Sequence, residues 1–426
     1  MYRDRLRMPT PPKPPKRWRL AHLRAIFLIA LALLGIGSGL VWREATVTDG
    51  SLVPLTIASH GISADSIVLP GPALTAKSAP SGSRAAASGS NTPVGIPTIT
   101  VASVGQDYGI AAGSSLTGMS NQQLNSEFSG MAALGVKWVR FDFDWGLIQP
   151  SNDHTYNWAV YDNLVTAART HGLQVLGIID YTPPWARPGC NSAQCPPSNP
   201  AQFATYAAAI AQRYKGQGLH YWEVWNEPNN PQFWVPGANA ATYTSLLKQA
   251  YVSLHAADSQ ALVITAGLSP AATTSTSYAP IDFLTAVYNN GGKGYFDAVA
   301  DHPYTYPLLP STNQNHAWNQ MASPARSLHQ LMVSNGDADK KIWITEFGAP
   351  TSGPDPYYQV SEAGEAQMVS DAINLYKSYT WVGPFFWYSY QDSGTDTSTN
   401  ENFFGLVRYD GSQKPAYQTF KQLIGS

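Results

Sequence analysis

The sequence predicts an α/β fold, specifically a (β/α)8 TIM barrel, over residues 105–426. Eight short apolar segments with strand character each precede a segment with helical spacing. The strands are apolar throughout, which is typical of a parallel sheet covered by helices. Polar residues gather where these strands end, the position of the working residues in such barrels. A doubly wound open sheet is the alternative, but no Gly-rich phosphate loop follows the first strand.

The elements alternate regularly along the chain. The predicted strands are 108–113, 137–145, 174–181, 221–227, 261–267, 295–304, 341–348 and 383–390. The predicted helices that follow them are 121–135, 158–172, 201–214, 241–257, 281–292, 325–336, 363–379 and 416–424. Gly172 closes the second helix, since glycine tolerates the conformation that ends a helix. Pro228 stops the fourth strand, because proline cannot donate to a ladder.

The N-terminal region has a different character. Residues 1–24 are basic, and 25–42 form an uncharged run of 18 residues, which as a helix would reach roughly 27 Å, enough for a bilayer core. We expect 1–24 to be a cytoplasmic tail and 25–42 a transmembrane signal-anchor, with a cleaved signal peptide as the alternative. Residues 43–104 read as a linker of low complexity in its second half. Either way, the body is predicted to be extracytoplasmic.

The composition limits the classes of partner that the protein can bind. After Arg43 the chain carries 17 basic and 27 acidic residues, so it lacks the positive surface that nucleic acids require. An acidic body also suits a neutral polymer better than an anionic one. The cysteines, Cys190 and Cys195, are expected to form a local disulfide outside the cytoplasm. His, Asp and Glu show no recognisable metal spacing, so we expect no metal, no cofactor and a monomeric protein.

Two glutamates at strand ends suggest the chemistry. Glu227 ends the fourth strand and Glu346 the seventh, so a barrel places them across its mouth. A pair of carboxyl groups flanking one bond is what glycoside hydrolysis requires, one protonated and one ionised. Arg140 supplies a cation that would lower the pKa of one of them. His302 and Tyr304 are placed to orient Glu346 by hydrogen bonding.

The motifs WNEPN (225–229) and TEFG (345–348) resemble those of clan A glycoside hydrolases, the retaining (β/α)8 glycosidases. With VRFDFDW (139–145) and YTPPWA (181–186), the likeness is closest to family 39, with the cellulase-like family 5 next. The resemblance covers about 105–426. It implies the following roles: Glu227 as acid/base, Glu346 as nucleophile, Asn226 holding the sugar 2-hydroxyl, and Arg140, His302, Tyr304 and Trp387 in the supporting positions.

Other residues admit two interpretations. Glu223 is read as a buried partner of a basic group rather than as catalytic. Trp185 can serve as a sugar platform or in packing, and the same holds for Trp145 and Trp234. Three acids, Asp142, Asp144 and Asp180, either bind hydroxyls or brace loops.

We therefore expect a retaining glycosidase that acts on a neutral poly- or oligosaccharide. A non-catalytic carbohydrate-binding surface protein on the same barrel is the alternative, because a fold does not fix a function.

Overall fold

The computed structural model describes residues 104–425. The predicted tail, membrane segment and nearly all of the linker lie outside this range. Within it, no helix combines the length and apolar character needed to cross a bilayer.

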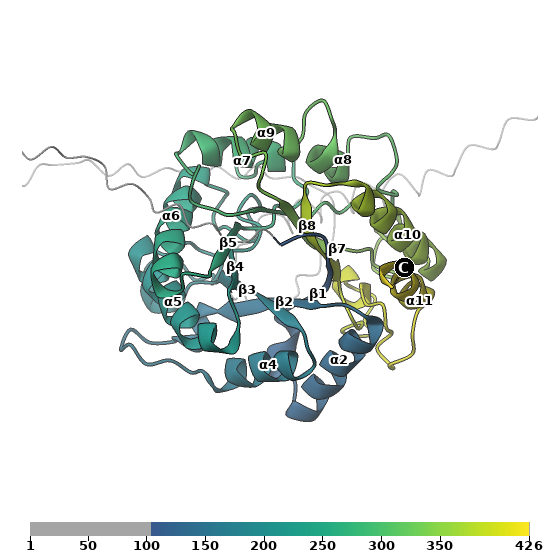
Figure 1. Ribbon diagram of the computed structural model, residues 1–426, viewed down its shortest axis with the longest axis horizontal. Helices are drawn as coiled ribbons and strands as arrows, with labels where there is room; N and C mark the ends of the chain where they lie inside the picture. Colours follow the sequence, from purple (N-terminus) through teal and green to yellow (C-terminus); the bar gives the residue numbers. More distant parts are fainter. Residues whose placement is uncertain (1–103, 426) are drawn as a thin grey trace, which may run out of the picture. The chain divides into compact units, whose positions relative to one another are not determined.

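The eight predicted strands form one parallel sheet that curls into a nearly closed barrel (Figure 1). Neighbours pair in the order β5-β4-β3-β2-β1-β8-β7-β6. An isolated parallel bridge between Ile264 and Ala298 links β5 to β6 across the remaining gap. The strands are β1 Tyr108–Gly113, β2 Trp138–Asp144, β3 Gln174–Asp180, β4 Tyr221–Val224, β5 Leu262–Thr265, β6 Val299–Asp301, β7 Ile342–Phe347 and β8 Val382–Tyr388.

Helices surround the strands in Figure 1. They are α2 Asn121–Leu134, α3 Trp145–Ile148, α4 Ala159–Thr170, α5 Pro200–Tyr214, α6 Ala240–Ala257, α7 Pro280–Asn289, α8 Ala317–Ala322, α9 Leu328–Ser334, α10 Glu362–Ser378 and α11 Pro415–Ile424. Local signals set several ends: Ser120 and Gln123 form a reciprocal capping box at the start of α2. The predicted α/β alternation is confirmed. The short α3 and α8 were not predicted, and α8 lies within the long connection between β6 and α9.

Side chains alternate between the barrel interior and the helix layer. Trp138, Trp343 and Phe386 belong to one buried cluster inside the barrel, where the Trp138 and Trp343 rings meet edge to face at 5.5 Å. Two residues further along β2, on the same face, is Arg140. The apolar interior therefore forms a floor, above which the polar mouth is built.

Two backbone irregularities aim the strand-end glutamates. β4 ends at Val224, earlier than predicted, because Trp225 and Glu227 take φ values of 75° and 45°. Such left-handed conformations in non-glycine residues are costly and cluster at functional sites. On β7, Ile344 pairs with Phe385 but Phe347 pairs with Trp387, so β7 carries one extra residue. A bulge of this kind re-aims side chains, and it lets Glu346 face the mouth next to inward-pointing Thr345.

Candidate active site

A buried ion pair lies at the base of the mouth. Arg140, which is fully buried, donates from Nε to Oε2 of Glu223 at 2.6 Å and from Nη2 to Oε1 at 3.1 Å. Glu223 also accepts from the backbone N–H of Gly267 at 2.7 Å. The predicted role of Glu223 as a buried partner of a basic group is borne out by these contacts. These two hydrogen bonds to Glu223 fix the plane of the guanidinium group, so its remaining N–H donors point toward the mouth of the barrel.

Those remaining donors hold the candidate catalytic side chains. Nη1 of Arg140 donates to Oε1 of Glu346 at 2.6 Å, and the Tyr304 hydroxyl donates to Oε2 at 2.8 Å. Burial raises the pKa of Glu346, but the charges of His302 and Arg140 and these hydrogen bonds outweigh it, so this pKa lies below its ordinary value. Glu346 is thereby held in its ionised form.

His302 lies between the two glutamates. Its Nδ1 is 2.9 Å from Oε1 of Glu227 and 3.6 Å from Oε2 of Glu346, while its Nε2 is 3.0 Å from the Thr345 hydroxyl. Gly267 makes room for this ring, because a Cβ there would lie 2.0 Å from Nε2. The backbone N–H of Glu227 donates to the carbonyl of the same glycine at 3.1 Å. The end of β5 therefore positions both the histidine and Glu227.

Glu227 and Glu346 open into a cavity of about 540 Å³, here called the catalytic pocket. Asn226 lines it as well, and its Oδ1 accepts from Nη2 of Arg140 at 2.9 Å, which leaves the amide N–H groups for a ligand. The lining residues are Gly113, Ser114, Asp142, Tyr181, Asn226, Glu227, Gln232, Phe233, Pro270, Tyr304, Tyr306, Glu346, Tyr358, Tyr388, Glu401 and Phe404. The pocket thus combines carboxyl groups with aromatic walls.

The prediction for Trp387 is wrong. Its side chain is fully buried and faces the helix layer, packing against Phe347 and Phe420. Because side chains alternate along a strand, the next residue, Tyr388, points into the mouth instead. Tyr388 lines the pocket and donates from its hydroxyl to Oε2 of Glu401 at 3.1 Å.

Trp185 does not line the catalytic pocket. It packs edge-on against Trp145 at 5.3 Å, and its indole N–H donates to the carbonyl of Gln149 at 3.1 Å. Trp145 and Trp234 are almost completely buried. Of the two interpretations, the structure therefore supports packing for all three tryptophans.

Several residues that form the walls of the catalytic pocket could not be placed from the sequence. Tyr358, Glu401 and Phe404 come from long connections after β7 and β8. Loop residues of this kind carry no periodic signal that would place them. Tyr388 was open to prediction through strand alternation, and Tyr181 as the last residue of the predicted strand 174–181.

The structure separates the three acids that the sequence left open. Asp144 accepts from the N–H of Leu147 at 3.1 Å and so caps α3. Asp142 lines the pocket with 6 % of its surface exposed, and neither hydrogen bond nor ion pair joins its carboxyl to another described residue. Burial raises the pKa of Asp142 to about 7, against the opposing charge of Arg140. Asp180 is fully buried, and burial followed by the charge of Asp142 raises its pKa well above normal.

One group of side chains has the spacing of a metal site. Glu227, His302 and Glu346 each offer a ligand atom, and these atoms lie within 4.8 Å of one another. Arg140 and Tyr304 already occupy both oxygens of Glu346. The guanidinium of Arg140 lies 2.6 Å from that carboxylate, and its positive charge disfavours a metal cation at the same place. That no metal takes part stays a prediction.

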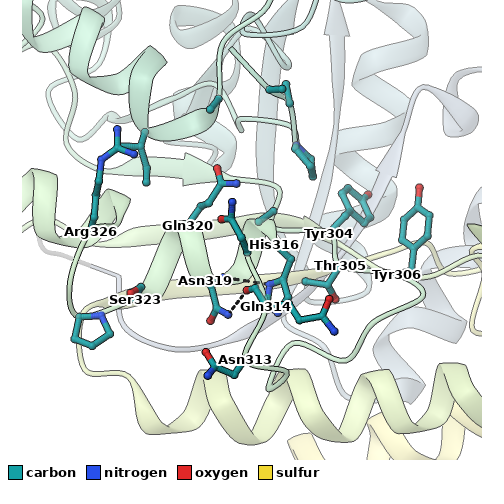
Figure 2. A pocket seen from close by; sticks show the side chains of 18 residues that line it. Tyr304, Thr305, Tyr306, Asn313, Gln314, His316, Asn319, Gln320, Ser323 and Arg326 are labelled. Atoms are coloured by element: carbon teal, nitrogen blue, oxygen red, sulfur yellow. Dashed lines mark hydrogen bonds between the residues drawn. The ribbon is translucent and has the colours of Figure 1, made fainter. Parts of the chain in front are cut away.

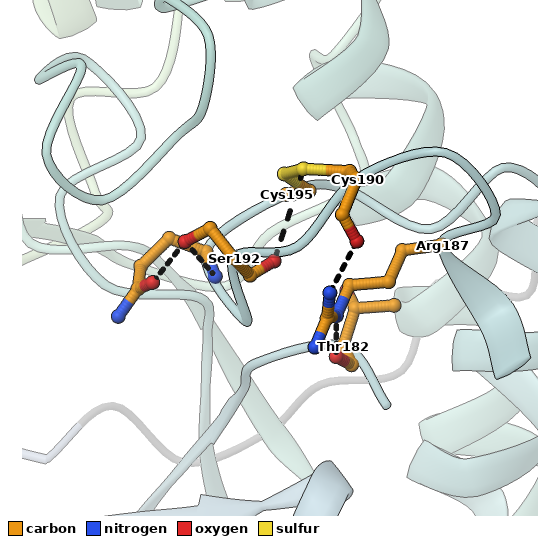
Figure 3. The surroundings of a disulfide bond; sticks show 6 residues. Thr182, Arg187, Cys190, Ser192 and Cys195 are labelled. Atoms are coloured by element: carbon orange, nitrogen blue, oxygen red, sulfur yellow. Dashed lines mark hydrogen bonds between the residues drawn. A yellow bond between two sulfur atoms is a disulfide. The ribbon is translucent and has the colours of Figure 1, made fainter. Parts of the chain in front are cut away.

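Cys190 and Cys195 are bonded to each other in the loop after β3 (Figure 3). Arg187 reaches back from this loop and donates from Nε to the carbonyl of Thr182 at 2.7 Å. The N–H of Thr182 in turn donates to the carbonyl of Ala193 at 2.8 Å. The loop therefore braces the residue that follows Tyr181 of the pocket wall.

Comparison with known proteins places this chain in a family. The family model of cellulase, glycosyl hydrolase family 5, matches residues 101–393. The chain therefore belongs to this family. The resemblance to clan A glycoside hydrolases is confirmed, and the matching family is the one that the sequence analysis placed second.

Individual relatives agree with the fold. A β-xylosidase from Caldicellulosiruptor saccharolyticus is 27% identical over 230 residues, which cover 51% of this chain and 44% of that protein. A family 39 glycoside hydrolase from Bacteroides cellulosilyticus WH2 superposes with a TM-score of 0.60 and 21% identity, covering 75% of this chain and 63% of that one. A monomeric β-xylosidase from Caulobacter crescentus CB15 gives 0.58 and 18%, with coverages of 74% and 67%. The chain thus spans less than half of the curated relative's length.

Proposed function

We propose that this protein is a retaining glycoside hydrolase that cleaves O-glycosidic bonds of a neutral poly- or oligosaccharide. The observation that carries the proposal is the pair Glu227 and Glu346, whose carboxylate oxygens approach within 4.8 Å across one pocket. Retaining enzymes hold their two carboxyl groups about 5–5.5 Å apart, whereas inverting enzymes leave roughly 6.5–9.5 Å for a water molecule. The short separation favours double displacement.

The roles follow from the surroundings of each glutamate. Glu346, kept ionised by Arg140 and Tyr304, attacks the anomeric carbon and forms a glycosyl-enzyme. Glu227 gives its proton to the departing oxygen and then removes a proton from the water that releases the sugar. Asn226, whose Oδ1 is fixed by Arg140, offers its N–H groups to the sugar 2-hydroxyl.

The lining of the catalytic pocket favours a neutral sugar over an anionic one. Its described lining contains the carboxyl groups of Asp142, Glu227, Glu346 and Glu401 and no lysine, arginine or histidine. An anionic sugar would therefore be repelled, while hydroxyl groups find acceptors and aromatic faces. The similarity to β-xylosidases makes xylose-containing substrates the first to test.

We propose that the catalytic domain works outside the cytoplasm as a monomer. The basic tail and the uncharged run of 18 residues that follows it support a membrane anchor. An anchored hydrolase would act near the cell envelope.

The test follows hydrolysis of aryl glycosides and neutral polysaccharides by the protein and by two variants. Glu346→Gln should abolish cleavage of all of them, because no nucleophile remains. Glu227→Ala should lose cleavage of polysaccharides but retain glycosylation by aryl glycosides with good leaving groups, which need no proton. Added azide should then restore turnover of these aryl glycosides and yield a glycosyl azide with retained configuration.

Two controls sharpen this test. Activity in a chelator should equal activity without it, and a loss would assign the Glu227, His302 and Glu346 group to a metal. Binding of polysaccharide without cleavage by any form would favour the alternative, a carbohydrate-binding protein, and reject the hydrolase.

A further inference from the structure

Lys414 is a buried cation that joins the connections after β7 and β8, behind the wall of the catalytic pocket. Its side chain is 1 % exposed. Nζ donates to Oδ1 of Asp392 at 2.9 Å, to the hydroxyl of Thr351 at 2.9 Å and to the carbonyl of Phe403 at 3.1 Å. An ammonium group carries three N–H donors, so Lys414 is bonded entirely within the protein.

The ion pair of Lys414 and Asp392 fastens the backbone on both sides of Phe404. On one side, the carbonyl of Phe403 accepts from Nζ of Lys414. On the other side, the N–H of Gly405 donates to Oδ1 of Asp392 at 2.8 Å. Gly405 lies so close that a Cβ there would be 2.1 Å from the backbone nitrogen of Asp392. Because the two charged side chains are bonded to each other, one ion pair fixes the residues before and after Phe404.

The connection after β7 secures the same point. The backbone N–H of Thr351 donates to the carbonyl of Phe403 at 3.0 Å, and its hydroxyl donates to the same oxygen at 3.3 Å. Further along, Nδ2 of Asn400 donates to the carbonyl of Tyr358 at 2.7 Å. The two connections that supply much of the pocket wall are therefore tied to each other, and Lys414 lies at one of the ties.

Phe404 carries this fixed position into the catalytic pocket. Its side chain lines the pocket and packs edge to face against Tyr388 and Tyr306, with ring centroids 5.2 and 5.7 Å away. Tyr306 in turn meets Tyr304 at 5.9 Å (Figure 2). The carbonyl of Phe404 accepts from the N–H of Ser389, directly after Tyr388, at 2.9 Å. The position of one phenylalanine therefore supports two tyrosines of the wall.

We infer that Lys414, paired with Asp392, is a positioning residue for substrate binding: it holds Phe404 and, through that ring, the aromatic wall against which a sugar lies. This inference rests on the proposed function. A wall that is fixed before the substrate arrives costs less conformational entropy on binding than a wall that the substrate must order.

The candidate catalytic side chains are held separately. Glu346 is bonded to Arg140 at 2.6 Å, and Glu227 lies 2.9 Å from His302. None of the partners of Lys414 described above belongs to this group. Loss of Lys414 should therefore weaken the binding of ground state and transition state alike, which raises KM and leaves kcat nearly unchanged. A role in folding stability alone would change neither constant below the unfolding temperature.

The test is the double variant Lys414→Met with Asp392→Asn. Methionine keeps an unbranched side chain without the ammonium group, and the asparagine oxygen can still accept from the N–H of Gly405. No charge of this pair is left without its partner. Burial raises the pKa of the neighbouring Glu365 well above its normal value, so this carboxyl group stays neutral. Steady-state kinetics on an aryl glycoside should show KM raised by about fivefold to tenfold.

A milder variant keeps the inference testable if the double variant does not fold. Thr351→Val removes one acceptor of Lys414 and leaves its ion pair intact. It should raise KM in the same direction, by about twofold to fivefold. Thr351→Ser keeps the hydroxyl group and should restore the KM of the wild type.

The matched control is Lys340→Met with Asp337→Asn. Nζ of Lys340 lies 3.1 Å from Oδ1 of Asp337, just before the start of β7 and so at the end of the barrel away from the pocket. Its loss should lower the free energy of unfolding, measured in urea, without changing KM.

An unchanged KM in both the double variant and Thr351→Val would overturn the inference. A fall in kcat with KM unchanged would also overturn it, because the effect would then lie on the catalytic residues. The same would follow if KM rose equally in the Lys340 control, since lost stability would explain it. Loss of cleavage in Glu346→Gln tests the proposed function separately, whichever way KM responds to Lys414.

Discussion

Arg140 donates a hydrogen bond from Nη1 to Oε1 of Glu346 at 2.6 Å, while Nε of the same guanidinium is bound to Glu223. One side chain therefore ties the candidate nucleophile to the floor of the barrel. This contact has two effects: the hydrogen bond holds the carboxylate in place, and the positive charge favours its ionised form.

Arg140→Lys should lower kcat by about 10²–10³, the usual cost of removing one preorganised donor at a reacting group. A lysine cannot make three directed bonds from one plane. Burial raises the pKa of Glu346, and the charges of His302 and Arg140 bring it below normal. Lysine keeps the positive charge but loses the hydrogen bond from Nη1, so this pKa should rise slightly and the acid limb of the pH profile of kcat/KM should move slightly to higher pH.

The control for this prediction is Arg169→Lys, an exposed arginine bonded to Gln174 at 2.8 Å. It should leave the profile unchanged. An acid limb that stays in place in Arg140→Lys would show that the positive charge, which lysine retains, sets the pKa of Glu346 without help from the hydrogen bond of the guanidinium.

Glu223→Gln should destabilise the fold by about 3–5 kcal/mol, the cost of leaving a buried charge without its partner. Glu223 is fully buried and also accepts from the N–H of Gly267 and the hydroxyl of Thr345. Urea unfolding of the inactive Glu346→Gln background, with and without the substitution, measures the loss apart from catalysis.

The double variant Arg140→Met with Glu223→Leu tests the same pair from the other direction. In the same Glu346→Gln background, replacing both charges by apolar groups leaves no ion of this cluster without a partner, so the stability should exceed that of Glu223→Gln. With Glu346 in place, the double variant should be inactive, since Glu346 loses its cation. A double variant less stable than Glu223→Gln would show that packing, not charge, dominates.

Glu127→Gln should stabilise the protein at pH 8 relative to pH 5. Glu127 lies on α2 with 9 % of its surface exposed, and burial raises its pKa from 4.5 to about 7. A raised folded-state pKa means that the favourable contribution is complete below 4.5 and is lost as pH rises through 7. At about 1.4 kcal/mol for each pKa unit, the loss is about 3.5 kcal/mol.

The neutral glutamine avoids that loss, so the difference in unfolding free energy between variant and wild type should grow from pH 5 to pH 8. Glu362→Gln is the control of opposite sign. Its hydrogen bond from Arg408 lowers the pKa of Glu362, and the substitution should bring no gain at pH 8. A pH-independent effect of Glu127→Gln would contradict the assignment.

The eight strand-helix units were predictable because each is a local pattern of apolar periodicity. Glu227 and Glu346 were predictable because a barrel brings all strand ends to one rim. The side of the strand that each residue faces was harder to predict from the sequence. Trp387 and Tyr388 differ by one position, and alternation along β8 sends the first to the helix layer and the second to the mouth.

The bulge on β7 is the clearest example of a feature that could not be predicted from the sequence. Strict alternation from Thr345 would turn Glu346 outward, and the extra residue that reverses this leaves no mark in the sequence. The walls of the pocket were also beyond prediction. Glu401 and Phe404 come from one long connection whose path depends on tertiary contacts, including the bond from Lys414 to the carbonyl of Phe403 at 3.1 Å.

Removing the disulfide should affect stability and substrate binding together. For a closed loop of six residues, the chain-entropy account gives a stabilisation of about 2 kcal/mol. The loop also reaches two walls of the catalytic pocket: the N–H of Thr182, beside Tyr181, donates to Ala193, and the N–H of Val235 donates to Gln194 at 3.2 Å.

Cys190→Ser combined with Cys195→Ser should therefore lower the unfolding free energy by about 2 kcal/mol and raise KM by about fivefold, the equivalent of 1 kcal/mol. The value of kcat should change little, because Arg140, Glu227 and Glu346 lie on strands two, four and seven and the segments directly after them. Steady-state kinetics and urea unfolding of the same preparation measure both effects. A loss of stability with KM unchanged would mean that the loop braces the fold without shaping the pocket, and an equal fall in kcat would place its influence on the catalytic residues themselves.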